Sequence, residues 1–116
     1  MKRRVLVTGS TQGIGKAIAA AFVKEGYEVI VHCSKDMEKA ERIRKEIGAT
    51  GAVTADLSDT SEERGLYKKT GAVDCLILNA SVQYKQQWQE ITEEAIDRQF
   101  SVNVKSTLLL MQAYYP

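Results

Sequence analysis

Two hydropathy patterns alternate along the first two thirds of the chain. Short apolar runs have the length and composition of buried strands. Between them, apolar residues recur every three or four positions, as in helices packed on a core. The predicted strands cover residues 4–7, 28–33, 52–55 and 73–78. The predicted helices cover residues 13–24, residues 36–47 and a shorter stretch that follows residues 59–61 and ends near Gly71.

The last third of the chain follows a different pattern. Residues 80–90 are polar and predict a loop. Thr92 then has the character of a helix N-cap, with Glu93 and Glu94 in the first turn, where acidic groups favour the helix dipole. We expect one long helix from there to Tyr115, with a bend near Asn103. The aromatic residues of this region are interpreted as packing groups; they are Tyr84, Trp88, Tyr114 and Tyr115.

Strand–helix alternation predicts an α/β fold of the doubly wound, Rossmann-like type, with a parallel sheet and helices on both faces. Right-handed crossovers make the strand order 3-2-1-4 natural. The direction of winding then reverses between the first and fourth strands, whose carboxyl ends flank the expected ligand crevice. Cys33 and Cys75 would lie on strands that are not neighbours, so we predict reduced thiols and a cytoplasmic protein.

Composition narrows the functional classes. Of the 116 residues, 44% are hydrophobic and 27% are charged, a globular balance that predicts one domain over residues 1–116. The formal net charge of +1 gives no basis for a nucleic-acid partner. The apolar run that follows Lys2-Arg3-Arg4 is too short for a signal peptide, and the run at residues 108–111 is too short to span a membrane. No metal site is predicted.

The most specific motif is residues 8–15, Thr-Gly-Ser-Thr-Gln-Gly-Ile-Gly, directly after the first strand. A strand, a glycine-rich turn and a helix N-terminus together expose backbone N–H groups to an anion such as a pyrophosphate. Gly9 would permit the turn, Gly13 the approach of a phosphate, and Gly15 close packing of the helix on the strand. A P-loop is excluded because Ser10 and Ala17 stand where that motif needs Gly and Ser or Thr.

The spacing Thr-Gly-x-x-x-Gly-x-Gly resembles the fingerprint of the short-chain dehydrogenase/reductase family. Three further matches follow in the family's order: Asp56-Leu57 after the third strand, Asn79-Ala80 after the fourth, and Asn103 in the last helix. Leu78 and Ser81 depart from the family's Asn-Asn-Ala-Gly motif at its first and last positions. Taken singly, Asp56 is better explained as a turn cap, and Asn79 can satisfy backbone groups at a strand end. An Asn within a helix, such as Asn103, usually faces solvent or marks a local kink.

The resemblance implies an NAD(P)(H)-dependent oxidoreductase that acts on a small-molecule carbonyl/alcohol pair. By this resemblance Asp56 and Leu57 border the adenine, and Asn79 and Ala80 border the adenine-proximal ribose. Asn103, the one catalytic residue assigned, would hold a water in a proton relay. The pyrophosphate end of the cofactor would be held by Gly9, Ser10, Thr11, Gly13, Ile14 and Gly15.

Cofactor preference depends on the end of the second strand, where NAD sites place an acidic group and NADP sites a basic one. Ser34 and Lys35 can hold a 2′-phosphate there, with a further hydrogen bond from Ser10. Gln12 stands where NADP-using relatives often carry Arg or Lys, and Asp36 lies close enough to serve an NAD site. We predict NADP(H) as the preferred cofactor and NAD(H) as the alternative.

The family's remaining catalytic groups, a Ser and a Tyr-x-x-x-Lys pair, have no match here. Neither Tyr114 nor Tyr115 has a Lys four residues later. We therefore expect residues 1–116 to be the N-terminal part of a longer single domain and to be inactive alone. The alternatives are a non-catalytic nucleotide-binding module and a remnant without function. The resemblance also implies assembly into dimers or tetramers.

Overall fold

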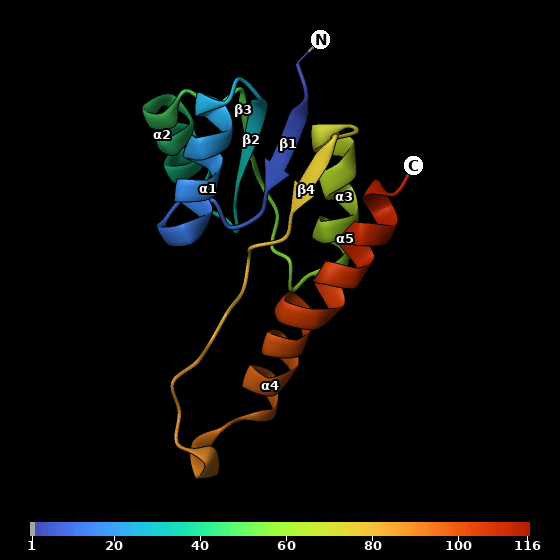
Figure 1. Cartoon of the computed structure of the whole chain (residues 1–116). Coiled ribbons are helices and arrows are strands. Elements are labelled where there is room, and N and C mark those ends of the chain that lie inside the picture. The colour runs from blue at the N-terminus through green and yellow to red at the C-terminus, as the bar shows by residue number, and fades with distance from the viewer. Residues whose placement is uncertain (1) are drawn as a thin grey trace.

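The computed structural model describes residues 2–116, in which strands and helices alternate as the hydropathy pattern predicts (Figure 1). The strands of this part of the chain are β1 (Arg4–Val7), β2 (Glu28–Cys33), β3 (Gly51–Thr54) and β4 (Cys75–Ile77). The helices between them are α1 (Gly13–Lys24), α2 (Met37–Ile47) and α3 (Thr60–Thr70). After the 3-10 turn η1 (Trp88–Glu90) come α4 (Glu93–Phe100), the π-helical turn η2 (Ser101–Lys105) and α5 (Ser106–Tyr114).

The strands form one parallel sheet in the order β3-β2-β1-β4, which confirms the predicted topology. β1 is central, and Val5, Leu6 and Val7 are fully buried. β4 is shorter than predicted by two residues at its start and by one at its end. At the start, the Asp74 N–H donates to the Arg4 carbonyl oxygen, while the Asp74 carboxylate accepts the Arg4 N–H at 2.8 Å. The Asp74 side chain thus takes the Arg4 N–H, and regular pairing begins at Cys75.

Apolar side chains fill both faces of the sheet. On one face, Val29 and Val31 of β2 pack with Ala19 of α1, and α2 completes this layer. On the other, Leu6 and Ile30 pack with Leu66 of α3 and Leu110 of α5. Each helical layer is thus anchored on alternate residues of the same strands, as a parallel sheet covered on both faces requires. Cys33 and Cys75 are free thiols on strands separated by β1.

Side-chain caps mark several helix starts. Asp36 accepts the Lys39 N–H at 3.0 Å before α2, and Asp59 accepts the Ser61 N–H at 2.9 Å before α3. Thr92 accepts the Ala95 N–H at 3.1 Å, which confirms the cap predicted for the last helical region. The irregularity expected near Asn103 is the π-helical turn η2, which joins α4 to α5 without a break.

The part of the chain from β4 to α4 extends away from the sheet as an arm (Figure 1), and the molecule is 52 Å along its longest axis. Most of the segment between β4 and α4 is neither helix nor strand. The prediction that its aromatic residues pack is wrong for Trp88, which is 78% exposed, and also for Tyr115 at the end of α5, which is 82% exposed. Tyr114 does pack, edge to face on Tyr67 of α3.

Candidate functional site

The glycine-rich loop between β1 and α1 has a backbone that ordinary residues rarely adopt. Gly9 and Gly13 have φ angles of +61° and +57°, in the left-handed region that favours glycine. A Cβ on Gly9 would lie 2.9 Å from the Ala80 Cα, and one on Gly15 would overlap the Gly9 carbonyl oxygen. A Cβ on Gly13 would meet nothing within 4 Å. Gly9 and Gly15 therefore serve packing, whereas Gly13 faces open space.

Hydrogen bonds tie one side of this loop to the end of β4. The Thr8 hydroxyl oxygen accepts the N–H groups of Asn79 and Ala80, each at 3.0 Å. The Asn79 side-chain amide donates to the Gly9 carbonyl oxygen at 3.0 Å. Thr8 is 1% exposed, so these bonds are shielded from water. The fingerprint Thr thus joins the two strands on either side of the sheet's switch point.

The other side of the loop is tied to β2 through His32. The Gly9 N–H donates to His32 Nδ1 at 2.9 Å, and His32 Nε2 lies 2.9 Å from the Ala55 carbonyl oxygen. The Ser10 hydroxyl accepts the His32 N–H at 2.8 Å, while the Ser10 N–H donates to the His32 carbonyl oxygen at 3.0 Å. Ser10 is fully buried, so its side chain holds the loop onto the sheet.

The first turn of α1 follows this fixed segment and presents unpaired N–H groups. The first four N–H groups of an α-helix lack intrahelical acceptors, and the helix dipole makes this end positive. The Gln12 side chain makes no capping bond, and the first turn contains no acidic residue. Ile14 is 75% exposed in that turn. This end of α1 is therefore electrostatically suited to an anion.

A cavity of about 420 Å³ opens beside the loop, at the carboxyl ends of β1 and β4. This volume lies within the range of small-molecule and cofactor sites. Its walls come from the loop, the end of β2, the segment after β3 and the segment after β4. The predicted site residues among its lining are Gly9, Thr11, Gly13, Ile14, Gly15, Ser34, Asp56, Leu57, Asn79 and Ala80.

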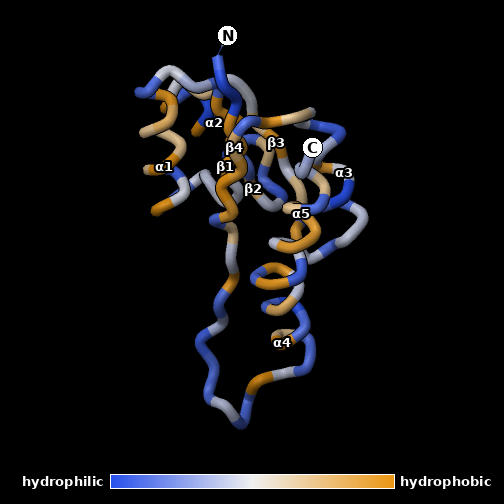
Figure 2. Tube along the Cα trace, turned by 45° about the vertical axis from the view of Figure 1, so that its right-hand side comes forward, coloured by the Kyte–Doolittle hydropathy of each residue, from blue (hydrophilic) through white to orange (hydrophobic). Residues whose placement is uncertain are grey.

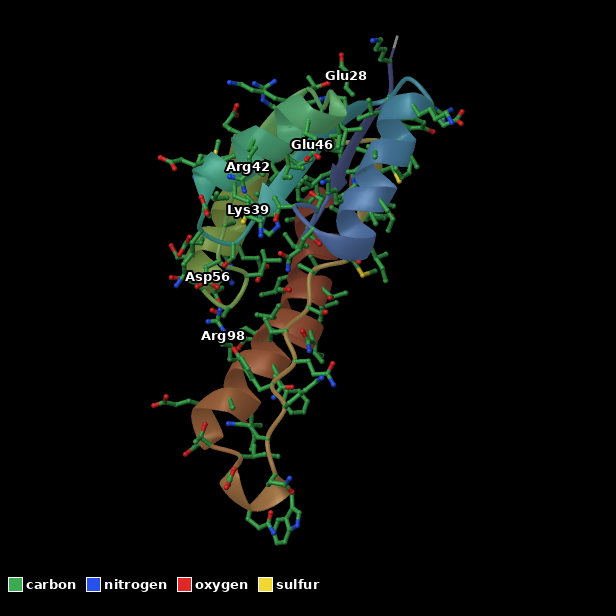
Figure 3. The ribbon with its side chains drawn as sticks, turned by 90° about the vertical axis from the view of Figure 1, so that its left-hand side faces the viewer. Glu28, Lys39, Arg42, Glu46, Asp56 and Arg98 are labelled. Atoms are coloured by element: carbon green, nitrogen blue, oxygen red, sulfur yellow. The ribbon has the colours of Figure 1, made fainter. Side chains whose placement is uncertain are left out.

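Asp56 forms a charged cluster at one end of this cavity (Figure 3). Its carboxylate accepts the Ser58 hydroxyl at 2.6 Å and lies 3.7 Å from the Lys35 ammonium and 4.0 Å from the Arg98 guanidinium. Burial alone would raise the pKa of Asp56. The hydrogen bonds from Ser58 and the charges of Arg98 and Lys35 more than offset burial, so this pKa lies below its ordinary value. Asp56 is therefore an ionised hydrogen-bond acceptor at neutral pH.

Polar groups on the loop and α2 meet at the edge of the cavity beyond β2. Lys39 of α2 reaches across to the loop, where its ammonium donates to the Gln12 side-chain oxygen at 2.8 Å (Figure 3). Lys39, Gln12 and Ser34 all line the cavity, whereas the predicted Lys35 does not. Asp36 does not line it either, since its carboxylate caps α2.

Asn103 lies outside this cavity, in η2. Its side-chain oxygen accepts the Val82 N–H and its amide donates to the Val82 carbonyl oxygen, both at 2.8 Å. This two-point contact fixes the segment after β4 against the helix. Val82 and Val102 line the cavity, so Asn103 supports one wall of it from behind.

Sequence reasoning missed the three basic residues that line the cavity, namely His32, Lys39 and Arg98. His32 carried a signal, because it is a polar residue near the end of an otherwise apolar strand and the only histidine of the chain. Lys39 and Arg98 lie on helices, where exposed basic residues are common, and nothing local distinguishes them.

Comparison with known proteins places this geometry in a family. The family model described as short chain dehydrogenase matches residues 3–116. The chain belongs to the short-chain dehydrogenase/reductase family. It is 39% identical over 116 residues to the sorbitol dehydrogenase of Cereibacter sphaeroides. The aligned region covers 96% of this chain and 45% of that relative.

Solved structures of the family match in both sequence and fold. A 3-oxoacyl (acyl-carrier-protein) reductase from Agrobacterium tumefaciens C58 with NADP bound is 33% identical, with a TM-score of 0.83 over 98% of this chain and 46% of that chain. A short chain dehydrogenase from Burkholderia cenocepacia J2315 in complex with NADP is 30% identical, with a TM-score of 0.86 over 97% of this chain and 49% of that chain. The chain spans about half the length of the curated relatives it matches.

Residues 2–116 contain no group of three or more His, Cys, Asp or Glu side chains placed to hold a metal ion. No helix within the same residues has both the length and the apolar character needed to cross a bilayer.

Proposed function

We propose that this chain binds the adenosine and pyrophosphate parts of a nicotinamide dinucleotide and supplies the cofactor half of an oxidoreductase site for a carbonyl/alcohol pair. The observation that supports this most strongly is the loop from Gly9 to Gly15. It holds unpaired N–H groups at the N-terminus of α1, beside a cavity at the switch point of the sheet. A Cβ on Gly13 would meet nothing within 4 Å, so there is open space beside the loop at this position.

The contacts that we propose for the pyrophosphate, the adenine and the ribose use residues that line the cavity. The N–H groups at the start of α1 would receive the pyrophosphate, and Ile14 would lie against it. Asp56, ionised and lining the cavity, would accept hydrogen bonds from the adenine amino group or nearby donors, with Leu57 as an apolar floor. Asn79 and Ala80 line the same cavity next to the loop, where the adenine-proximal ribose would lie.

A bound nicotinamide would supply hydride transfer to or from the substrate carbon. The residues of this chain would orient that cofactor and border the substrate. Asn103 keeps its predicted place in a proton relay, and its bonds to Val82 add a second role, that of fixing the wall of the site. The relatives include enzymes named for different substrates, so we propose a small-molecule carbonyl/alcohol pair and no more specific substrate.

We propose that NADP(H) is the preferred cofactor, held at its 2′-phosphate by Ser34 and Lys39. Both residues line the cavity, and the Lys39 ammonium bonds to a neutral partner, Gln12, so its charge is not neutralised. Asp36, which would favour NAD, is engaged as the cap of α2. NADP is also the cofactor in the two family structures described above. Lys39 thus replaces Lys35 as the basic residue that we assign to this role.

Fluorescence titration with NADPH and NADH tests both parts of the proposal. We expect Lys39→Met to weaken NADPH binding about tenfold and to change NADH binding by less than about twofold, as loss of one charge-assisted contact predicts. Lys45→Met, on an exposed position of the same helix, is the matched control and should change neither. Tighter binding of NADH than NADPH would overturn the cofactor preference. Binding of neither by the unaltered protein would overturn the function.

A second candidate is a nucleotide-binding module without catalysis, since the cavity and the glycine-rich loop serve cofactor binding in either case. Cofactor binding without turnover of any carbonyl or alcohol substrate would support this candidate. Assembly into dimers or tetramers remains a prediction from the family resemblance, to be tested by sedimentation.

A further inference from the structure

We propose that His32 is a positioning residue for cofactor binding, whose neutral imidazole fixes the backbone at Gly9 and Ser10 so that the following N–H groups can receive the pyrophosphate. The inference rests on the proposed function, because it assigns His32 to that same site. His32 lines the cavity but is 2% exposed, and the role that we assign to it acts through the loop.

The partners of the imidazole determine which of its nitrogens carries the proton. The Gly9 N–H is a donor, so Nδ1 at 2.9 Å must be the acceptor and must lack a proton. The Ala55 carbonyl oxygen is an acceptor, so Nε2 at 2.9 Å must donate. Only the neutral Nε2–H tautomer satisfies both bonds. His32 is 2% exposed, so water cannot easily replace either partner.

These bonds act on the loop where its shape is set. Gly9 has the first left-handed φ of the loop, and its carbonyl oxygen accepts the Asn79 amide on the opposite side. Gly9 is therefore held at its N–H by β2 and at its carbonyl by the segment after β4. With both ends fixed, the peptide groups that follow enter α1 in one direction. An imidazole that ceases to accept would free one of these two attachments.

Protonation would produce that loss. A proton on Nδ1 would face the Gly9 N–H, so that two donors would oppose each other. Burial lowers the pKa of His32, the hydrogen bond to Ala55 opposes this effect, and the charge of Lys69 lowers the pKa further. The neutral form therefore persists below the usual pH range of histidine.

The charged groups around His32 support the same state. Lys69 of α3 donates to the Thr54 carbonyl oxygen at 2.7 Å, next to Ala55, and Lys39 of α2 is bonded to Gln12 of the loop. Asp56 follows Ala55, but its carboxylate is bound by Ser58 and paired with Lys35 and Arg98. Residues 5–12, in β1 and the loop, carry no ionisable side chain. No carboxylate is therefore free to favour an imidazolium.

The test compares a substitution that keeps the bond to Gly9 with one that keeps neither bond of the imidazole. His32→Asn places an amide near the position of Nδ1 and can still accept from Gly9, whereas His32→Leu accepts nothing. Two readouts are needed: amide hydrogen exchange at Gly9 without cofactor, and the dissociation constant for NADPH. We expect His32→Leu to speed Gly9 exchange and to weaken NADPH binding, each about tenfold, with His32→Asn recovering most of both. Phe22→Leu, which disturbs the Phe22–Tyr27 pair at the far end of α1, is the matched control for general loss of stability.

The outcomes separate this inference from the proposed function. If the unaltered protein binds no cofactor, the function fails, and Gly9 exchange still tests whether His32 fixes the loop. If it binds NADPH and His32→Leu binds equally well, the positioning role is wrong and the function stands. Should His32→Leu not fold, nitrogen NMR of the unaltered protein decides. A neutral Nε2–H imidazole at about pH 6 is expected, and a protonated ring or the Nδ1–H tautomer would overturn the inference.

Discussion

The region around the glycine-rich loop and the helical region from α4 to α5 differ in how far their side chains are covered by the described residues. Around the loop, Val5, Val7 and Ser10 are fully buried, and the loop is bonded to both neighbouring strands. Hydrophobic residues recur along α4, η2 and α5 (Figure 2). A row of them is exposed, including Phe100 at 63% and Leu108 at 57%. The region around the loop is covered by contacts within residues 2–116. The helical region from α4 to α5 presents an apolar surface that residues 2–116 do not cover.

The largest expected effect lies at Gly15, where the first region is most tightly packed. Gly15→Ala would drive a Cβ into the Gly9 carbonyl oxygen and to 2.5 Å from the Asn79 amide nitrogen. Both partners are held by other bonds, so we expect a loss of about 3 kcal/mol or failure to fold. Gly65→Ala in α3, where a Cβ would meet nothing within 4 Å, should instead stabilise by about 0.5–1 kcal/mol. Urea unfolding measures both, and equal effects would contradict this account of the loop.

Two leucines on α5 sharpen the comparison within a single helix. Leu110 is 1% exposed and packs in the core with Leu66, so Leu110→Ala should cost about 3 kcal/mol of unfolding free energy. Leu108 is 57% exposed, and Leu108→Ala should cost less than about 0.5 kcal/mol in the isolated chain. Thermal unfolding at low protein concentration gives both values. A large effect at Leu108 would show that this surface is covered in solution.

The junction of the two regions depends on Asn103. Asn103→Ala removes both bonds to Val82, and we expect a loss of about 1–2 kcal/mol together with faster exchange of the Val82 amide. In a catalytically active form, turnover should fall more than NADPH affinity, since Asn103 lies outside the cofactor cavity. Unchanged turnover with the Val82 amide exposed would leave Asn103 a structural role only.

The smallest expected effect is a pH dependence of the folding stability that originates at His32, beside the glycine-rich loop. Burial, the first cause, lowers the pKa of His32 in the native state, so below about pH 6.5 the unfolded chain takes up a proton that the folded chain does not. Stability should therefore fall as the pH drops from about 7.5 to about 5.5. His32→Asn should flatten this part of the profile. Unfolding midpoints that decline equally in both proteins would assign the effect to another group.

Sequence patterns predicted the sheet well because its determinants are local. Four apolar runs separated by helical segments leave few topologies once crossovers are right-handed, and the order 3-2-1-4 followed. The irregularity near Asn103 also appeared at the expected place. The exposure of Trp88 could not be predicted, because the segment around it has no periodic face.

The side chains of the site were harder to predict because their partners are distant in sequence. Lys35 was predicted because it lies two residues after the end of β2, yet its ammonium pairs with Asp56. Lys39 instead reaches Gln12, 27 residues away in the sequence. His32 bonds to Gly9 and Ala55, each 23 residues away. Such pairs are set by the register of parallel strands and the angle of a helix, neither of which a hydropathy pattern contains.

The π-helical turn η2 has a consequence for the phase of the exposed row. Ile96, Phe100, Val104 and Leu108 are spaced four residues apart, and in an ideal α-helix each step of four would rotate a side chain about 40° past the last. A turn closed by i→i+5 bonds contains more residues than an α-helical turn, so each residue in η2 turns the chain through a smaller angle. Across η2, a step of four residues therefore offsets the rotation that accumulates in the α-helical parts. Removing one residue from η2 would turn α4 by about 100° relative to α5 and split one apolar line into two.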